Sequence, residues 1–135
     1  MYSTPGLHFV NGRHWWTQCE QYSQTTRCMT RIWATQVRLV NGAYGNVNDW
    51  VFNNLTYLPY MTRAQWSHNP LGYTGEWTAT DGRRWRTECD TPVSGGNGCR
   101  SQVYTQVVRQ VTNPDGTREF RKQWEWVFNN IVRFK

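Results

Sequence analysis

The four cysteines are the residues of this chain whose spacing says most about their chemistry. They form two closely spaced pairs, Cys19 with Cys28 and Cys89 with Cys99. Zinc-binding cysteines typically stand two to four residues apart, so neither gap is typical of a metal site. His8 and His14 lie near the first pair, whereas the matching positions near the second pair hold Thr78 and Arg84. We therefore predict two disulfides, no metal ion and no cofactor, and an oxidising compartment.

The remaining reactive side chains form no recognisable catalytic set. A nucleophile needs a base within hydrogen-bonding reach, and the three histidines share no motif with serine or aspartate. No GxSxG or HExxH motif occurs, and no glycine-rich phosphate loop precedes a predicted helix. Glu20 and Asp90 each follow the first cysteine of a pair. Glycosidases use paired carboxylates, but acidic residues beside a cystine are ordinary on a surface, so we expect no catalytic residues and no enzyme activity.

Arginine and tryptophan supply groups suited to binding. The 135 residues include thirteen arginines, two lysines and nine tryptophans, with a net charge of +6. Arginine can grip a carboxylate or phosphate with its planar fork and can stack on an aromatic ring. The sequence places such residues together just before the first cysteine of each pair. The predicted ligand-binding residues are Trp15, Trp16, Arg84, Trp85 and Arg86.

These residues belong to a stretch that occurs twice. "GRHWWTQC" at residues 12–19 returns as "GRRWRTEC" at residues 82–89, and "WVFNNL" at 50–55 returns as "WVFNNI" at 126–131. Because the order and spacing of these segments agree, the sequence predicts two copies of one unit. The predicted units are residues 1–60 and 77–135, joined by a linker at 61–76 that contains Pro70 and two glycines.

Each unit has the pattern of a small antiparallel sheet. Short aromatic and threonine-rich segments follow "NG" and "DG" turn signals, and long runs rich in β-branched residues end at "NG" (Asn41–Gly42) or "NPDG" (113–116). The "WVFNN" segments lack a helical apolar stripe, so we predict strands there, with a short helix as the alternative. The predicted fold class is all-β, with two tandem antiparallel β-meander repeats in a pseudo-two-fold relation, each stapled by one disulfide. Two such units could pack face to face or extend one continuous sheet.

The repeat also predicts where the aromatic residues lie. Rings shared by both units are expected to form the core, with ligand contact as the alternative: Trp15 and Trp85, Trp33 and Tyr104, Trp50 and Trp126. Rings outside the shared pattern are expected to be exposed: Trp16, Trp66, Trp77 and Trp124. The adjacent asparagines of "WVFNN" are interpreted as hydrogen-bonding ties at strand ends, or alternatively as groups that bind sugar.

The combination "DGRRWRTECDT", "GGNGCRS" and "WVFNNIVRF" resembles a repeat near the C-termini of secreted or surface proteins of actinobacteria. Both predicted units match, so the resemblance spans nearly the whole chain. It implies a location outside the cell, beside wall-active or adhesive domains, and carries no assigned activity. A weaker likeness to choline- and glucan-binding repeats rests on "VNGRHWW" and "TDGRRWR", and we carry no ligand over from it.

These observations predict a secreted or cell-surface, non-catalytic binding module for a cell-envelope glycan or an anionic wall polymer. The alternative is an extracellular protein-interaction or adhesion module, with another surface protein as the partner. Nucleic-acid binding through arginine and stacking rings is a weaker alternative, because the predicted disulfides argue against it. No segment approaches the roughly 20 apolar residues that cross a bilayer, so we expect no membrane insertion.

Overall fold

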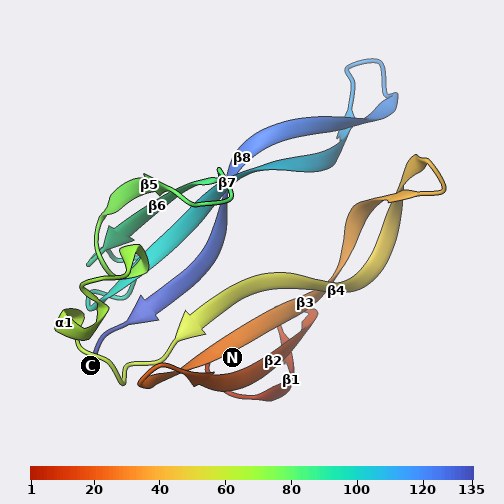
Figure 1. Cartoon of the computed structure of the whole chain (residues 1–135). Coiled ribbons are helices and arrows are strands. Elements are labelled where there is room, and N and C mark those ends of the chain that lie inside the picture. The colour runs from red at the N-terminus through yellow and green to blue at the C-terminus, as the bar shows by residue number, and fades with distance from the viewer.

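The computed structural model describes residues 1–135 and consists mainly of one eight-stranded β-sheet (Figure 1). The predicted all-β class is confirmed, and the two halves extend one continuous sheet. Each half contributes four sequential antiparallel strands, and the halves meet where β4 and β8 run parallel, giving the order β1-β2-β3-β4-β8-β7-β6-β5. The strands are β1 (Gly6–Val10), β2 (Arg13–Tyr22), β3 (Thr25–Val40), β4 (Ala43–Tyr57), β5 (Gly75–Thr78), β6 (Arg84–Cys89), β7 (Gly98–Thr112) and β8 (Arg118–Arg133).

Tight turns fix the register of the first half. Asn11 and Gly12 have φ values of 53° and 74°, and Asn41 and Gly42 have φ values of 51° and 83°. A two-residue hairpin turn whose twist matches that of the strands needs positive φ at both positions, which is why "NG" is favoured there. Both "WVFNN" segments lie within the long strands β4 and β8, so the strand prediction is confirmed.

The two longest hairpins project beyond the rest of the sheet as a pair of arms (Figure 1). Strands β4 and β8 pair only over Leu55–Tyr57 and residues 130–132. The arms touch again near their tips, where Asn46 Nδ2 donates to Gln110 Oε1 at 3.2 Å. Nearby, the ring centroids of Tyr44 and Phe120 are 5.9 Å apart. The arms are thus joined at the base by backbone hydrogen bonds and near the tips by side chains.

Both predicted disulfides are formed, and no cysteine is free. Each joins residues directly opposite each other on neighbouring strands, Cys19 with Cys28 across β2 and β3, and Cys89 with Cys99 across β6 and β7. This bonding is typical of proteins of an oxidising environment. In each half we call the side of the sheet that carries the cystine the disulfide face, and the other side the open face.

The largest hydrophobic cluster lies on the disulfide face of the second half, beneath the segment that joins the halves. Its buried members are Tyr57, Met61, Trp66, Cys99, Val132 and Phe134. The joining segment, predicted as the linker 61–76, contains the short helix α1 (Arg63–Trp66), a 3₁₀ turn at Pro70–Gly72 and the first residues of β5. The linker therefore packs over the sheet and closes the main hydrophobic cluster.

Trp66 corrects the sequence prediction, because it is only 1% exposed. It stacks on Tyr22 at 6.2 Å and meets Tyr57 edge to face at 5.2 Å between ring centroids. Gly72 passes so close that a Cβ there would lie 2.6 Å from the Cβ of Trp66. Because Trp66 lies outside the repeated pattern, the sequence predicted an exposed side chain. In the structure, Trp66 is instead the centre of the contact between the linker and the sheet.

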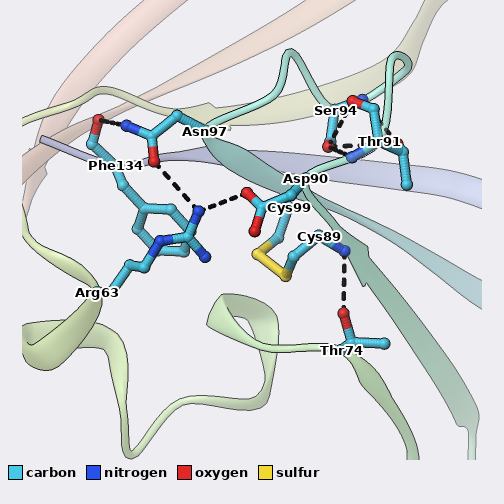
Figure 2. Close-up of polar contacts among 9 residues, drawn as sticks. All are labelled: Arg63, Thr74, Cys89, Asp90, Thr91, Ser94, Asn97, Cys99 and Phe134. Carbon is cyan, nitrogen blue, oxygen red and sulfur yellow. Dashed lines mark hydrogen bonds and ion pairs between the residues drawn. A yellow bond between two sulfur atoms is a disulfide. The ribbon is translucent and has the colours of Figure 1, made fainter.

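Polar contacts hold the linker to the second half (Figure 2). Arg63 forms an ion pair with Asp90, which follows β6, and its Nη2 donates to Asn97 Oδ1 at 3.1 Å. Asn97 Nδ2 donates to the carbonyl of Phe134 at 3.3 Å, and the Arg63 guanidinium lies 4.3 Å from the centre of the Phe134 ring. One arginine on α1 thus ties together the disulfide loop and the C-terminal residues.

Small polar residues are buried at matching places in both halves. Thr17 and Thr30 share a hydrogen bond of 3.0 Å across β2 and β3, and Thr87 and Ser101 share one of 2.7 Å across β6 and β7. The second asparagine of each "WVFNN" segment is completely buried, and Asn54 Nδ2 donates to Thr56 Oγ1 at 3.0 Å. Asn54 and Asn130 are therefore internal to the sheet and do not contribute to a sugar-binding surface.

The shared aromatic residues do not form the buried core that the repeat predicted. All six are partly or largely accessible, and Trp33 is 44% exposed. Among the rings predicted to be exposed, Trp124 is exposed at 59%, while Trp16 and Trp77 are half-buried. Because few elements cover this sheet, most of its strand side chains remain partly accessible to solvent. The helices are all too short to traverse a lipid bilayer.

Candidate ligand-binding faces

Strand alternation divides the five predicted ligand-binding residues between two faces. Successive side chains of a strand point to opposite sides of a sheet. Trp15 and Trp85 are in phase with Cys19 and Cys89 and lie on the disulfide faces, whereas Trp16, Arg84 and Arg86 lie on the open faces. The predicted residues therefore do not converge on one site.

The two tryptophans of the disulfide faces are held by neighbouring groups. Trp15 Nε1 donates to the Val10 carbonyl at 3.2 Å, and its ring meets Tyr2 edge to face at 6.3 Å. Trp85 stacks on Trp77 with 5.8 Å between centroids and 13° between planes. Both rings complete the packing of an edge hairpin, which is a structural role.

The open face of the second half combines arginines with aromatic rings. Register places Arg84 beside Tyr104 and Tyr104 beside Trp126, and the next row holds Arg86, Gln102 and Phe128. Arg100, two residues before Gln102, lies on the same face. We name this set the arginine–aromatic face: Arg84, Arg86, Arg100, Tyr104, Trp126 and Phe128.

Each arginine of this face lies over a ring. The Arg86 guanidinium carbon is 4.3 Å from the centre of the Trp126 ring, and that of Arg100 is 4.4 Å from the centre of the Phe128 ring. Arg84 is 5.7 Å from Trp126 and 5.8 Å from Tyr104. Such stacking orders a guanidinium in one plane while its N–H groups remain free to bind at the edge.

Two of these cations have no acidic partner. Among the ion pairs within 4.0 Å, Arg84 has Glu76 at 3.7 Å, whereas neither Arg86 nor Arg100 has one. Arg86 Nε donates instead to the neutral Gln102 Oε1 at 2.6 Å. A shallow depression lies between them, lined by Arg86, Glu88, Thr91, Val93, Arg100 and Gln102. Glu88 lies opposite Arg100 in the strand register and lines the same depression, but it forms no ion pair within 4.0 Å with either guanidinium. Two guanidinium groups without an ion pair beside a depression form a surface suited to carboxylate or phosphate.

The open face of the first half carries tryptophans at corresponding places. Trp16 meets Trp50 at 6.0 Å and Trp33 meets Trp50 at 5.5 Å between centroids, both edge to face. Arg31 lies 5.9 Å from the Trp16 ring and has no carboxylate within 4.0 Å. Phe52, opposite Arg31 on β4, is 41% exposed. We name this set the tryptophan face: Trp16, Arg31, Trp33, Trp50 and Phe52.

The two carboxylates considered for catalysis are both engaged by arginines. Glu20 pairs with Arg27 on β3, and Asp90 pairs with Arg63 on α1. No three histidine, cysteine or acidic side chains gather as metal ligands. His8 Nε2 lies 2.6 Å from the Thr4 carbonyl oxygen, which is a local contact at the start of the chain.

Sequence reasoning named Trp16, Arg84 and Arg86 as binding residues, gave ligand contact only as the alternative role of Tyr104 and Trp126, and missed Arg100 and Phe128. Arg100, Tyr104, Trp126 and Phe128 come from β7 and β8, far along the chain from "GRRWR". The signal was present in the alternation of "WEWVF", which puts Trp124, Trp126 and Phe128 near one face. The strand register was needed to bring them next to β6.

Comparison with known proteins found no matching family model, no matching curated protein and no matching solved structure. The resemblance to actinobacterial surface repeats remains a prediction of the sequence.

Proposed function

We propose that this chain is a secreted, non-catalytic module that binds an anionic polymer of the cell envelope, such as an acidic glycan or a phosphodiester wall polymer. The observation that carries the proposal is the pair of guanidiniums over aromatic rings, Arg86 and Arg100, which form no ion pair within 4.0 Å and border one depression. The net charge of +6 adds a general attraction for polyanions.

The aromatic rings favour a polymer with apolar ring faces. Tyr104 lies 5.2 Å from Trp126 and 5.7 Å from Trp124 between centroids, so three rings on two strands run from the base of the arm outwards. Trp124 is 59% exposed and can offer its surface to a ligand. Glutamines on the same face, Gln102 and Gln106, can hydrogen-bond hydroxyl groups. Rings, amides and cations in one row suit a sugar chain that bears acidic groups.

The location outside the cytoplasm is supported by the two disulfides and the absence of free cysteines. A wall or surface polymer is the abundant polyanion in that setting. Single-stranded nucleic acid also combines negative charge with stacking rings. For this reason it belongs in the test as a competing ligand.

The test measures binding of the purified chain to three polymers: polygalacturonate, which carries carboxylates, poly(glycerol phosphate), which carries phosphodiesters, and neutral dextran. We expect one of the anionic polymers to bind and dextran to bind more weakly. The double variant Arg86→Gln/Arg100→Gln is expected to weaken binding at least about tenfold, because it removes two charge-assisted contacts.

The matched control is Arg118→Gln/Lys135→Gln, which removes the same charge from an arm tip and from the C-terminal residue, where no carboxylate is paired. Equal loss of binding in both double variants would mean that only net charge matters and would contradict a defined site. Failure of both anionic polymers at low salt would reject the function. Tighter binding of single-stranded poly(dT) than of either polymer would favour a nucleic-acid ligand instead.

A further inference from the structure

The parallel pairing of β4 and β8 places the two open faces on opposite sides of the molecule. Residues paired across parallel strands point to the same side of a sheet. Leu55 belongs to the open face of the first half, because its neighbours Asn54 and Thr56 are in phase with Cys28. Its partner across the junction is Asn130, which is in phase with Cys99 on the disulfide face of the second half.

The same reversal appears in the core beneath the linker. Tyr57 and Tyr22 come from the open face of the first half, and Cys99 and Val132 come from the disulfide face of the second, yet all contact one cluster. At the junction, the side of the sheet that continues the tryptophan face is therefore the side that carries the second cystine. The arginine–aromatic face begins on the other side.

The two open faces also share the chemistry used in the proposed function. Each has aromatic rings from its β3–β4 or β7–β8 hairpin and a guanidinium that lies over a ring and lacks a carboxylate partner. In the first half this guanidinium is Arg31 over Trp16. Further along the same face, Thr35 Oγ1 donates to Asn48 Oδ1 at 2.5 Å, so this half carries a hydroxyl and an amide where the second half has the amides of Gln102 and Gln106.

We propose that the tryptophan face is a second binding site for the same anionic polymer, so that one chain bridges two polymer strands. This inference rests on the proposed function and names a further property of it. A single short ligand cannot lie on both sites, since the sheet separates them. Two separate strands of polymer can occupy them at once, and a monomer then acts as a cross-link.

Charge distinguishes the two sites. The arginine–aromatic face has three arginines, of which Arg84 alone has an acidic partner, whereas the tryptophan face has Arg31. Salt screens attraction between exposed charges. Binding at the second-half site should therefore weaken strongly as salt increases, while binding at the first-half site should change less.

The experiment uses beads coated with whichever anionic polymer the chain binds, and it measures both retention of protein and agglutination of the beads. The wild-type chain is expected to do both. The first-half variant Trp33→Ala/Phe52→Ala removes two accessible rings, and the second-half variant is Arg86→Gln/Arg100→Gln. Each is expected to keep retention at one site and to need at least about tenfold more protein for agglutination.

Tyr60→Ala/Tyr73→Ala is the matched control, because these rings are 58% and 49% exposed and belong to neither face. This control should agglutinate beads as the wild type does. Circular dichroism of each variant checks that the sheet is retained, and sedimentation checks that the chain is a monomer.

The outcomes separate the two proposals. Retention with no agglutination, or agglutination unaffected by Trp33→Ala/Phe52→Ala, would overturn the bridging inference and leave the single-site function intact. Agglutination only under conditions where the chain forms dimers would also overturn it. A wild-type chain that no anionic polymer retains would reject the proposed function and the bridging inference together.

Discussion

The two halves of the chain share a strand order and a cystine position but present different chemistry on their open faces. Where the first half has His14, Trp16 and Met29, the aligned positions of the second half hold Arg84, Arg86 and Arg100. The buried positions of the disulfide face change much less, since Thr17 and Thr30 correspond to Thr87 and Ser101. The packed face therefore constrains residue type, whereas the accessible face carries different side chains on a backbone of the same strand order.

The halves also differ in how their disulfide faces are covered. In the second half, α1 and the 3₁₀ turn bring Trp66 and Leu71 over the cystine. In the first half, the N-terminal residues cover the disulfide face less extensively. The Met1 carbonyl accepts a hydrogen bond of 2.9 Å from Thr17 Oγ1, and the Tyr2 ring contacts Trp15 edge to face. We therefore expect the stability of the second half to depend more on tertiary packing than the stability of the first half does.

Removal of the linker's main ring should have the largest effect. Trp66→Ala should lower the free energy of unfolding by about 3–5 kcal/mol, because a fully buried indole leaves a cavity between the linker and the sheet. Trp124→Ala, on an exposed position, should cost about 0.5 kcal/mol or less. Urea unfolding measures both, and similar losses would show that the linker does not cover a core.

Loss of one cystine should have the next largest effect and should differ between the halves. The closed loops are similar in length, with sequence separations of 9 and 10, so loop entropy alone gives each about 2–3 kcal/mol. Cys89 and Cys99 also contact the main cluster, whereas the first cystine does not. The Cys89→Ala/Cys99→Ala variant should therefore melt at a lower temperature than Cys19→Ala/Cys28→Ala. Equal melting temperatures would contradict unequal packing.

The buried hydroxyl pairs provide the finest comparison. Thr87→Val leaves Ser101 without the partner it has in the sheet and should cost about 1–2 kcal/mol, the usual penalty for an unpaired buried hydroxyl. Thr30→Val should cost less, about 0.5–1 kcal/mol, because Thr17 keeps its bond to the Met1 carbonyl. Denaturant midpoints of the two variants show which substitution costs more stability. A larger loss for Thr30→Val would contradict the compensating role of the Met1 carbonyl.

Local features of the fold could be predicted from the sequence because short-range physics decides them. Positive φ at Asn41 and Gly42 comes from the turn itself, and the cystines join residues that one hairpin already brings together. Strand alternation likewise separates Trp15 from Trp16 without knowledge of the rest of the molecule. The predicted site ignored this alternation, which is why it grouped residues from opposite faces.

Long-range arrangement decided the rest. The burial of Trp66 depends on a linker folding back over β7 and β8. The aromatic partners of Arg86 and Arg100, Trp126 and Phe128, come from a strand 40 and 28 residues later in the chain. The parallel junction of β4 and β8, which turns the two open faces away from each other, involves only three residues of each strand. The strands, turns and disulfides follow from the residue pattern, since each depends on neighbours in the chain. Which faces are covered and which are exposed depends on contacts between distant segments, and these contacts appear only in the folded chain.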